Sequence, residues 1–326
     1  MEYRTFGNTD LKVSAIGFGT WPIGGTYVEK GYGGVDDQEA IAAIRRALDL
    51  GITCFDTAPA YGLGRAEKIL GQALGADRTR VVVVTKCGIP FIPEEKRFGR
   101  NSTYGHIMES AEESLRNLAS DYVDVLLIHW PDVATPLEET MRALVDLRAS
   151  GKVRYAGVSN FSVQQVEEAL RFCPLAVQQI GYNLFDRRRE GELPFLRERG
   201  VGVMAYGPLA HGLLTGTFTP ETTFGEQDWR ASGKAFGLPI FERENFVKNV
   251  AVVDRLKEVA REHGRSVPQL AIAWVLRRAE VTTALIGARK PNEIEDSAGA
   301  ADWQLSQSEI DRIEEIMKDA AGTHIV

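Results

Sequence analysis

Hydrophobic positions follow two alternating periods along most of the chain. Short continuous apolar runs, such as residues 81–84 (VVVV), fit strands that are buried on both faces, as in a parallel sheet. Each run is followed by a stretch in which apolar residues recur at helical spacing, as Ile41, Ile44 and Leu48 do within residues 37–50. The pattern predicts a series of β-then-α units with no break in composition.

Eight such units favour a (β/α)8 TIM barrel that spans residues 1–326 as one domain. The predicted strands are residues 15–20, 53–56, 81–86, 123–129, 154–159, 176–182, 202–206 and 283–287. The predicted helices are residues 37–50, 104–118, 136–149, 162–170, 246–263, 268–278, 292–300 and 306–318. A doubly wound open sheet is the alternative, but it needs a Gly-rich turn that neither residues 17–19 (GFG) nor 62–64 (GLG) complete.

Two segments depart from the alternation. Residues 3–13 hold Gly7-Asn8 between short extended runs, which predicts an N-terminal β-hairpin that closes the bottom of the barrel. Residues 215–245 show no period, and a loop of this length is usually functional. We expect it to lie over the cofactor or substrate site, with a disordered surface insertion as the alternative.

Composition narrows the classes of function. The chain has 326 residues, of which 44% are hydrophobic, and a formal net charge of -7, which argues against general nucleic-acid binding. Charges near the N-terminus argue against a signal peptide, and the lack of a long apolar stretch argues against a membrane span. Cys54, Cys87 and Cys173 have no metal or redox spacing, so we expect a reducing cytoplasmic setting.

Four reactive side chains lie at or just after the ends of predicted strands. Strand two ends at Asp56, with Tyr61 in the next loop, while strands three and four end at Lys86 and His129. Each has an ordinary structural explanation, such as a turn aspartate or a lysine reaching out from a strand end. Because the C-terminal ends of barrel strands meet at one mouth, we expect the four to converge there.

Together these groups suit proton donation to a carbonyl oxygen. A phenol has a pKa near 10, and a neighbouring ammonium such as Lys86 would lower it. Asp56 would keep Lys86 charged, and His129 would bond to the same substrate oxygen. The sequence contains no G-x-S-x-G motif and no cluster with metal-ligand spacing, so we expect neither a serine hydrolase nor a metal site.

Reduction of a carbonyl also needs a hydride, which side chains do not supply, so a nicotinamide cofactor is implied. Ser159, Asn160 and Gln179 offer donors and acceptors for its carboxamide, and Tyr206 offers a ring for stacking. The backbone of the next segment would approach a pyrophosphate, at Gly207, Pro208, Leu209 and Gly212.

Several motifs resemble those of a known family. GITCFDTAPAYGLGRAEKILG (51–71) is similar to the first aldo-keto reductase signature, and VVVVTK, LLIHWP, GVSNF and AYGPLAHGLLTG follow in the family's order. LIGARKPNEIEDSAGAADWQLS (285–306) resembles its last cofactor segment. The subgroup resembled is bacterial and includes the inositol-locus reductase and relatives of potassium-channel β-subunits. The resemblance implies a TIM-barrel NAD(P)H-dependent oxidoreductase with Tyr61 as the proton donor.

The same resemblance places five residues at the adenosine end of the cofactor, namely Gly287, Arg289, Lys290, Glu293 and Ser297. Arg289 and Lys290 would pair with the 2′-phosphate of NADP(H). Glu293 would repel that phosphate, although it can bond to the ribose hydroxyl of NAD(H). Both cofactors remain open, and the basic pair weighs slightly toward NADP(H).

The substrate is expected to be a small carbonyl compound or alcohol. Trp21 and Trp130 are candidates for an aromatic pocket wall, and Tyr27, Tyr32 and Phe91 are weaker ones. A sugar and a hydrophobic aldehyde or ketone fit equally well. Two other functions stay open: a cofactor-sensing regulatory subunit with little turnover, and a lyase or isomerase that uses Lys86 as a Schiff base. No pattern indicates the oligomeric state.

Overall fold

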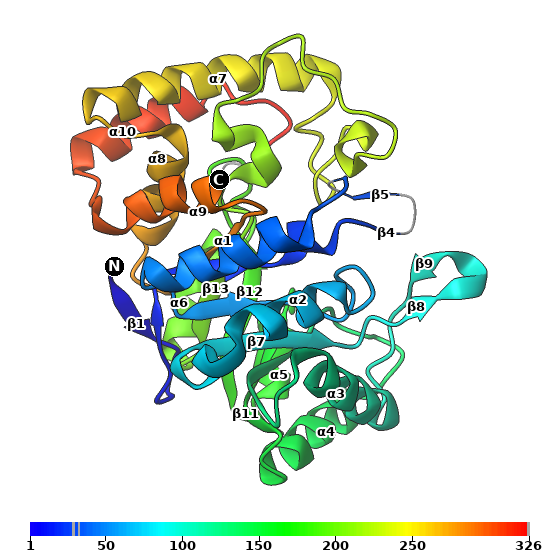
Figure 1. Cartoon of the computed structure of the whole chain (residues 1–326). Coiled ribbons are helices and arrows are strands. Elements are labelled where there is room, and N and C mark those ends of the chain that lie inside the picture. Colours follow the sequence, from blue (N-terminus) through cyan, green and yellow to red (C-terminus); the bar gives the residue numbers. More distant parts are fainter. Residues whose placement is uncertain (28–29, 32, 325–326) are drawn as a thin grey trace.

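The chain folds as a closed barrel of eight parallel strands surrounded by helices (Figure 1). The computed structural model describes residues 1–27, 30–31 and 33–324. The barrel strands are β3 (Ile16–Gly19), β6 (Cys54–Asp56), β7 (Val82–Cys87), β10 (Val123–Ile128), β11 (Val153–Ser159), β12 (Leu175–Gly181), β13 (Gly202–Tyr206) and β14 (Val281–Gly287). Because β14 pairs with β3, the sheet has no open edge, which confirms the predicted TIM barrel and excludes the open sheet.

The helices that cover the barrel are α1 (Asp37–Asp49), α2 (Arg65–Leu74), α3 (Tyr104–Leu118), α4 (Leu137–Ala149), α5 (Val163–Ala169), α6 (Leu193–Glu198), α7 (Arg243–Glu262), α8 (Val267–Leu276), α9 (Pro291–Ala298) and α10 (Gln307–Met317). Sequence analysis missed α2 and α6. α2 has no side-chain cap and carries Gly71, whose Cβ would lie 2.5 Å from the Leu118 carbonyl oxygen. This glycine lets α2 approach the end of α3, and it weakens the helical signal in the sequence.

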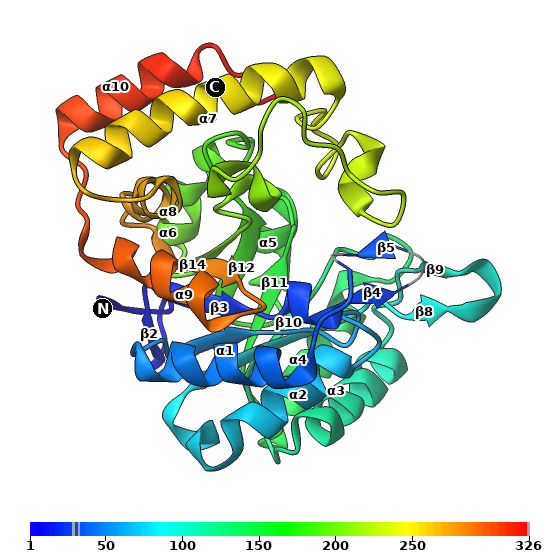
Figure 2. The same cartoon turned by 45° about the horizontal axis from the view of Figure 1, so that its top comes forward.

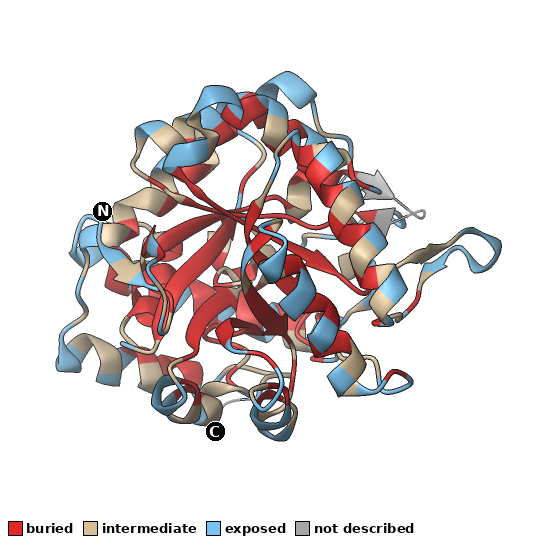
Figure 3. Ribbon diagram, turned by 90° about the horizontal axis from the view of Figure 1, so that it is seen from below, coloured by how far each residue is buried: buried red, intermediate tan, exposed pale blue. Residues whose placement is uncertain are grey.

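The barrel strands are buried on both faces, as their apolar runs predict. Val82, Val84 and Val125 belong to the cluster that fills the barrel, while Val83 and Leu126 pack outward against the helices. Viewed from below, the strands form a buried centre and the helices expose only their outer faces (Figure 3). Two apolar faces per strand remove the need for alternating polar residues.

The predicted N-terminal hairpin closes the bottom of the barrel. β1 (Tyr3–Thr5) and β2 (Lys12–Ser14) pair antiparallel, and Phe6 packs in the same cluster as Val82 and Val125. The backbone of Gly7 is so close to the barrel that a Cβ would lie 2.1 Å from the Gly200 carbonyl oxygen. Side chains therefore fill this end of the barrel.

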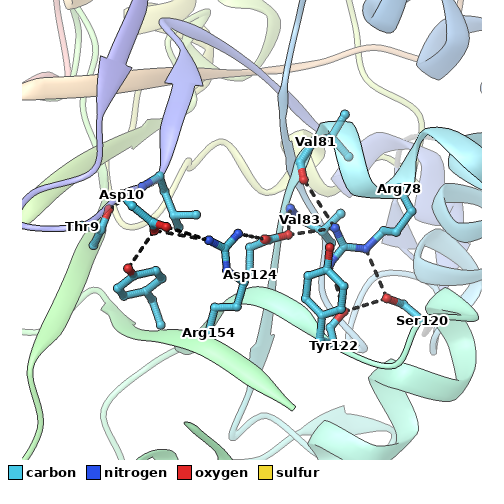
Figure 4. A network of polar contacts seen from close by, with 11 residues as sticks. Thr9, Asp10, Arg78, Val81, Val83, Ser120, Tyr122, Asp124 and Arg154 are labelled. Atoms are coloured by element: carbon cyan, nitrogen blue, oxygen red, sulfur yellow. Dashed lines mark hydrogen bonds and ion pairs between the residues drawn. The ribbon is translucent and has the colours of Figure 1, made fainter. Parts of the chain in front are cut away.

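A charged network ties the hairpin to the barrel (Figure 4). The buried carboxylate of Asp124 accepts hydrogen bonds from Arg78 and Arg154, both at 2.8 Å, and from the backbone N–H of Val83 at 2.9 Å. Arg154 also pairs with Asp10 of the hairpin at 3.1 Å. Each oxygen of the buried carboxylate therefore faces a guanidinium.

The loops at the top of the barrel carry two small hairpins, β4–β5 (Thr26–Tyr27 and Lys30–Gly31) and β8–β9 (Phe91–Ile92 and Arg97–Phe98). Figure 2 shows both on the same side of the molecule. Residues 216–242, all of them described, contain a short 3-10 turn at Trp229–Ser232 and isolated β-bridges, such as the one between Ala235 and Leu238. The N–H of Gly31 donates to the Gln227 carbonyl at 3.0 Å, so this long loop is attached to the first hairpin.

Candidate active site

A cavity of about 740 Å³ opens at the C-terminal ends of the barrel strands. The predicted site residues that line it are Trp21, Asp56, Tyr61, His129, Trp130, Ser159, Asn160, Gln179, Tyr206, Gly207, Pro208, Leu209, Gly212, Gly287, Arg289, Glu293 and Ser297. Two predicted residues are not in its lining: Lys86 lies beneath it, and Lys290 pairs with Glu39 on α1 at 3.3 Å. A common end for all strands explains why residues so far apart in sequence meet here.

Lys86 and Asp56 form a buried ion pair on neighbouring strands. The Lys86 ammonium donates to both carboxylate oxygens of Asp56 at 2.7 Å and to the Thr57 carbonyl at 2.9 Å. Burial lowers the pKa of Lys86 and raises the pKa of Asp56, while the attraction between the two opposes both shifts. The three hydrogen bonds fix the position of the ammonium at the base of the cavity.

Tyr61 and His129 lie next to this pair. The Lys86 nitrogen is 4.9 Å from the centroid of the Tyr61 ring, and the ring centroids of Tyr61 and His129 are 5.9 Å apart at an angle of 83°. Burial, together with the positive charges of Lys86 and Arg100, lowers the pKa of His129 well below its usual value. The site thus combines a phenol, a fixed ammonium and an uncharged imidazole.

A second set of polar side chains adjoins the first. The Asn160 amide nitrogen donates to the His129 carbonyl at 3.2 Å and to the Ser159 hydroxyl at 3.0 Å, while the Asn160 amide oxygen accepts from the Tyr206 hydroxyl at 3.0 Å. Asn160 has a left-handed backbone, with φ of 62°. Burial raises the pKa of Tyr206, so its phenol stays protonated and remains a donor.

Gln179 has a partner that sequence analysis did not foresee. Its amide nitrogen donates to Asp56 at 2.7 Å. The backbone carbonyl of the same residue accepts from the Ser159 hydroxyl at 3.1 Å. Gln179 therefore links the ion pair to the Ser159–Asn160 segment.

The glycine-rich loop after β13 has a strained backbone. Ala210, His211 and Gly212 all have positive φ, at 45°, 58° and 103°. A left-handed conformation costs a non-glycine residue about 1–2 kcal/mol, and such strain is concentrated at functional sites. This is the segment in which sequence analysis places the pyrophosphate.

The long loop contributes aromatic side chains to the same wall. Trp229 lies 5.7 Å from Trp21 and 5.4 Å from His211 between ring centroids, and Phe236 lies 5.6 Å from Tyr206. Thr217, Phe218, Arg230 and Phe236 of this loop line the cavity. The sequence signal for these contacts is only the presence of aromatic residues in an aperiodic segment.

At the far end of the cavity Glu293 is turned toward Arg289. One carboxylate oxygen accepts the backbone N–H of Arg289 at 2.7 Å, and the other lies 3.7 Å from its guanidinium. The Ser297 hydroxyl donates to the Glu293 carbonyl at 3.0 Å, within the same helix. The basic residue predicted to meet a phosphate therefore already faces a carboxylate.

The substrate side of the cavity includes residues that sequence analysis missed. Phe98 and Arg100 line it, and the Arg100 guanidinium lies 5.2 Å from the centroid of the Trp130 ring. In the sequence, the only indication that these two side chains share a face is their spacing of two residues, which places them on the same side of an extended segment. Of the weaker candidates, Phe91 packs on Phe98 at 5.5 Å, while Tyr32 and the side chain of Tyr27 lie outside the described residues.

A smaller cavity of about 310 Å³ reaches Lys86 and His129 from the side of α3, whose His106 and Glu113 also line it. In the described ranges, no three His, Cys, Asp or Glu side chains are grouped as metal ligands would be. The helices of that same part of the chain are too short or too polar to span a bilayer.

Comparison with known proteins gives the family. The model of the aldo/keto reductase family matches residues 15–318. Aldo-keto reductase YhdN of Bacillus subtilis is 38% identical, covering 98% of this chain and 94% of that protein, and an NADH-specific methylglyoxal reductase of Escherichia coli is 34% identical, covering 95% and 96%. The structure of the glycerol dehydrogenase AKR11B4 from Gluconobacter oxydans matches with a TM-score of 0.89 and 37% identity, covering 99% of this chain and 97% of that one. The fold, the ordered motifs and these matches agree: the chain belongs to the aldo/keto reductase family.

Proposed function

We propose that this protein is an NAD(P)H-dependent oxidoreductase that interconverts a carbonyl compound and its alcohol. The observation that carries the proposal is the Lys86 ammonium, which lies 4.9 Å from the Tyr61 ring centroid and is bonded to both oxygens of Asp56. Family membership supports the class of reaction. The roles of individual residues and the choice of substrate and cofactor are our proposals.

Tyr61 is the proposed proton donor. A positive charge beside a phenol favours the phenolate and so lowers the pKa of the phenol, and Asp56 keeps the Lys86 ammonium charged and in place. The uncharged imidazole of His129 donates a hydrogen bond to the same substrate oxygen. Because negative charge develops on that oxygen during reduction, both donors bind the transition state better than the ground state.

The residues present fit a nicotinamide cofactor, which supplies the hydride when it is bound. Ser159, Asn160 and Tyr206 place hydroxyl and amide groups beside His129, where a carboxamide needs them. The cavity continues past the strained glycine-rich loop to Arg289, which precedes α9. The lining thus offers polar contacts at both ends of an extended molecule.

The basic residues Arg289 and Lys290 slightly favour NADP(H) when the sequence is considered alone. The contacts of Glu293 in the structure are a stronger argument, and they favour NAD(H). Its carboxylate is bonded to the Arg289 backbone and lies near the Arg289 guanidinium, while Lys290 is paired with Glu39 outside the cavity. A 2′-phosphate would have to displace or face this carboxylate, whereas a ribose hydroxyl can donate to it. We therefore propose a preference for NAD(H).

The test of the reaction is Tyr61→Phe, assayed on a panel of aldehydes, ketones and sugars with both cofactors. We expect turnover to fall by about 10³-fold or more, since general acid catalysis contributes 10²–10⁴-fold, with cofactor binding retained by fluorescence titration. Tyr104→Phe is the matched control, because the Tyr104 hydroxyl bonds Asp146 on the outside of the barrel. Normal turnover by Tyr61→Phe would reject the proton donor, and cofactor binding without turnover in the wild type would favour a regulatory subunit.

The test of the cofactor is Glu293→Gln, which keeps an acceptor for the Arg289 N–H but removes the charge. We expect kcat/KM for NADPH to rise relative to NADH by about fivefold, since removing one unfavourable charge contact near the phosphate is worth roughly 1 kcal/mol. Glu295→Gln is the control, because Glu295 is on the same helix but pairs with Arg46 at 2.6 Å. A wild-type enzyme that prefers NADPH would contradict the assignment.

A further inference from the structure

Arg100 is a cation on the substrate side of the cavity that the proposed reaction does not use. It lines the cavity together with Tyr61, His129 and Trp130. Its guanidinium lies over the Trp130 ring, 5.2 Å from the centroid. An arginine in this position is placed to meet a substrate rather than a cofactor phosphate.

The backbone holds Arg100 in place from both sides. The N–H of Gly99 donates to the Pro90 carbonyl at 2.9 Å, and the N–H of Asn101 donates to the Gly88 carbonyl at 3.1 Å. These bonds extend the β8–β9 hairpin, so side chains alternate between its faces. Phe98 and Arg100 share the face that lines the cavity, and Arg97 is not part of that lining.

The charge of Arg100 is not neutralised by an ion pair within the described residues. Its side chain donates to the neighbouring Gly99 carbonyl at 3.2 Å, and no carboxylate oxygen lies within 4.0 Å of it in that part of the chain. Asp132 is the nearby acid, but its oxygens already accept from the Ser102 and Ala134 backbone and from the Thr135 hydroxyl. The Arg100 charge is nonetheless felt within the site, since it helps to lower the pKa of His129.

Other cations around the cavity have carboxylate partners. Lys86 is paired with Asp56, Arg230 with Asp228 at 2.6 Å, and Arg289 lies near Glu293. Among the described residues that line the cavity, Arg100 is thus the arginine without a carboxylate partner, and its planar donors can meet oxygen atoms of an incoming molecule. Guanidinium groups bind carboxylates and phosphates in a bidentate manner, which fixes orientation as well as affinity.

We infer that Arg100 anchors an anionic group of the substrate, so that the preferred substrates are small carbonyl compounds that carry a carboxylate or a phosphate. This inference rests on the proposed reduction at Tyr61. The guanidinium holds the charged end of the molecule near Trp130, and the carbonyl end extends toward Tyr61 and His129. A neutral aldehyde of the same length enters the same cavity but lacks this anchor.

The experiment compares matched anionic and neutral aldehydes with the full-length enzyme and the better cofactor. The pairs are 4-oxobutanoate against its methyl ester, and glyceraldehyde 3-phosphate against glyceraldehyde, so the two arms separate carboxylate from phosphate. We expect the wild type to prefer at least one anion by about tenfold in kcat/KM, since charge-assisted bonds are strong but this side chain is exposed to solvent. Raising the salt concentration should reduce the preference.

Arg100→Met should remove most of the anion preference, mainly through KM, and Arg100→Lys should keep part of it. Arg97→Met is the matched control, because Arg97 is on the same hairpin and pairs with Glu95 at the surface; it should leave the preference intact. Equal kcat/KM for anion and ester in the wild type would overturn the inference while leaving the proposed reaction standing. So would an equal fall for both substrates in Arg100→Met, or loss of the preference in Arg97→Met. If no aldehyde is reduced at all, the proposed function fails and the inference falls with it.

Discussion

Lys86 and Asp56 form an ion pair that is almost completely buried. The ammonium meets both carboxylate oxygens at 2.7 Å, and the two residues expose 0% and 3% of their surface. At such burial each charge depends on the other for its solvation. The pair that positions the proposed proton donor is therefore also part of the folded core.

Removing either partner alone should destabilise the protein strongly. Lys86→Met leaves a buried carboxylate and Asp56→Asn leaves a buried ammonium, at a cost of about 3–5 kcal/mol each. The double variant, which buries no charge, should lose less stability than the sum of the two. Urea unfolding of the four proteins gives the coupling free energy. The exposed pair Arg199–Glu167 is the control cycle and should couple by about 1 kcal/mol or less, and additive effects at Lys86 and Asp56 would contradict the interpretation.

Glu67 should make the protein less stable at high pH. It is fully buried and accepts hydrogen bonds from Thr85 at 2.7 Å and Asn117 at 2.9 Å, and burial raises its pKa above the ordinary value of 4.5. The native state then keeps a proton that the unfolded chain releases, so this stabilisation is complete below pH 4.5 and is lost as pH rises through the native pKa.

Glu67→Gln should flatten the pH dependence of unfolding above pH 4.5. The readout is the free energy of unfolding at several pH values, compared with the surface variant Glu258→Gln. If wild type and Glu67→Gln had parallel curves above pH 4.5, Glu67 would not hold a proton in the native state that the unfolded chain releases.

His211 should have the opposite effect. Burial lowers the pKa of His211 to about 4, so between pH 6.5 and 4 the unfolded chain binds a proton that the native protein does not. Its stabilising contribution is complete above pH 6.5 and is lost as pH falls, by up to about 1.4 kcal/mol per pH unit. His211→Asn also loses ring contacts with Trp229 and Phe236, which lowers stability by a constant amount. The diagnostic is the slope below pH 6.5, which should be shallower in the variant; an unchanged slope would mean that the imidazole titrates as in water.

Disrupting the charged network at the bottom of the barrel should lower the stability of the protein without lowering its catalytic activity. Asp124→Asn leaves Arg78 and Arg154 facing a neutral amide, and we expect a loss of about 3–5 kcal/mol because the site is buried. The kcat of the folded fraction should not change, since the network lies at the opposite end from Tyr61. Asp10→Asn, on the exposed rim of the same network, is the control and should have little effect. A drop in kcat for Asp124→Asn would show that the two ends are coupled.

Periodicity and motif order were enough to predict the barrel and the convergence of Asp56, Tyr61, Lys86 and His129. Parallel strands in a barrel all end on the same side. Once the strands are located in the sequence, the residues at their C-terminal ends are therefore known to lie at the same end of the barrel. The hairpin around Gly7 was predictable for a similar reason, because its turn residues and short extended runs act locally.

Contacts made across the fold were decided only by the tertiary structure. Three examples are the hydrogen bond from Gln179 to Asp56, the packing of Phe236 beside Tyr206 and the position of Arg100 over Trp130. Each contact joins two separate segments, and hydrophobic periodicity does not determine how separate segments meet in space. The contact between Glu293 and Arg289 is local to the start of α9, and it is the basis of the proposed preference for NAD(H). Local sequence patterns determine how a segment buries its apolar face, whereas the partner of a loop side chain depends on distances that arise when the whole barrel closes.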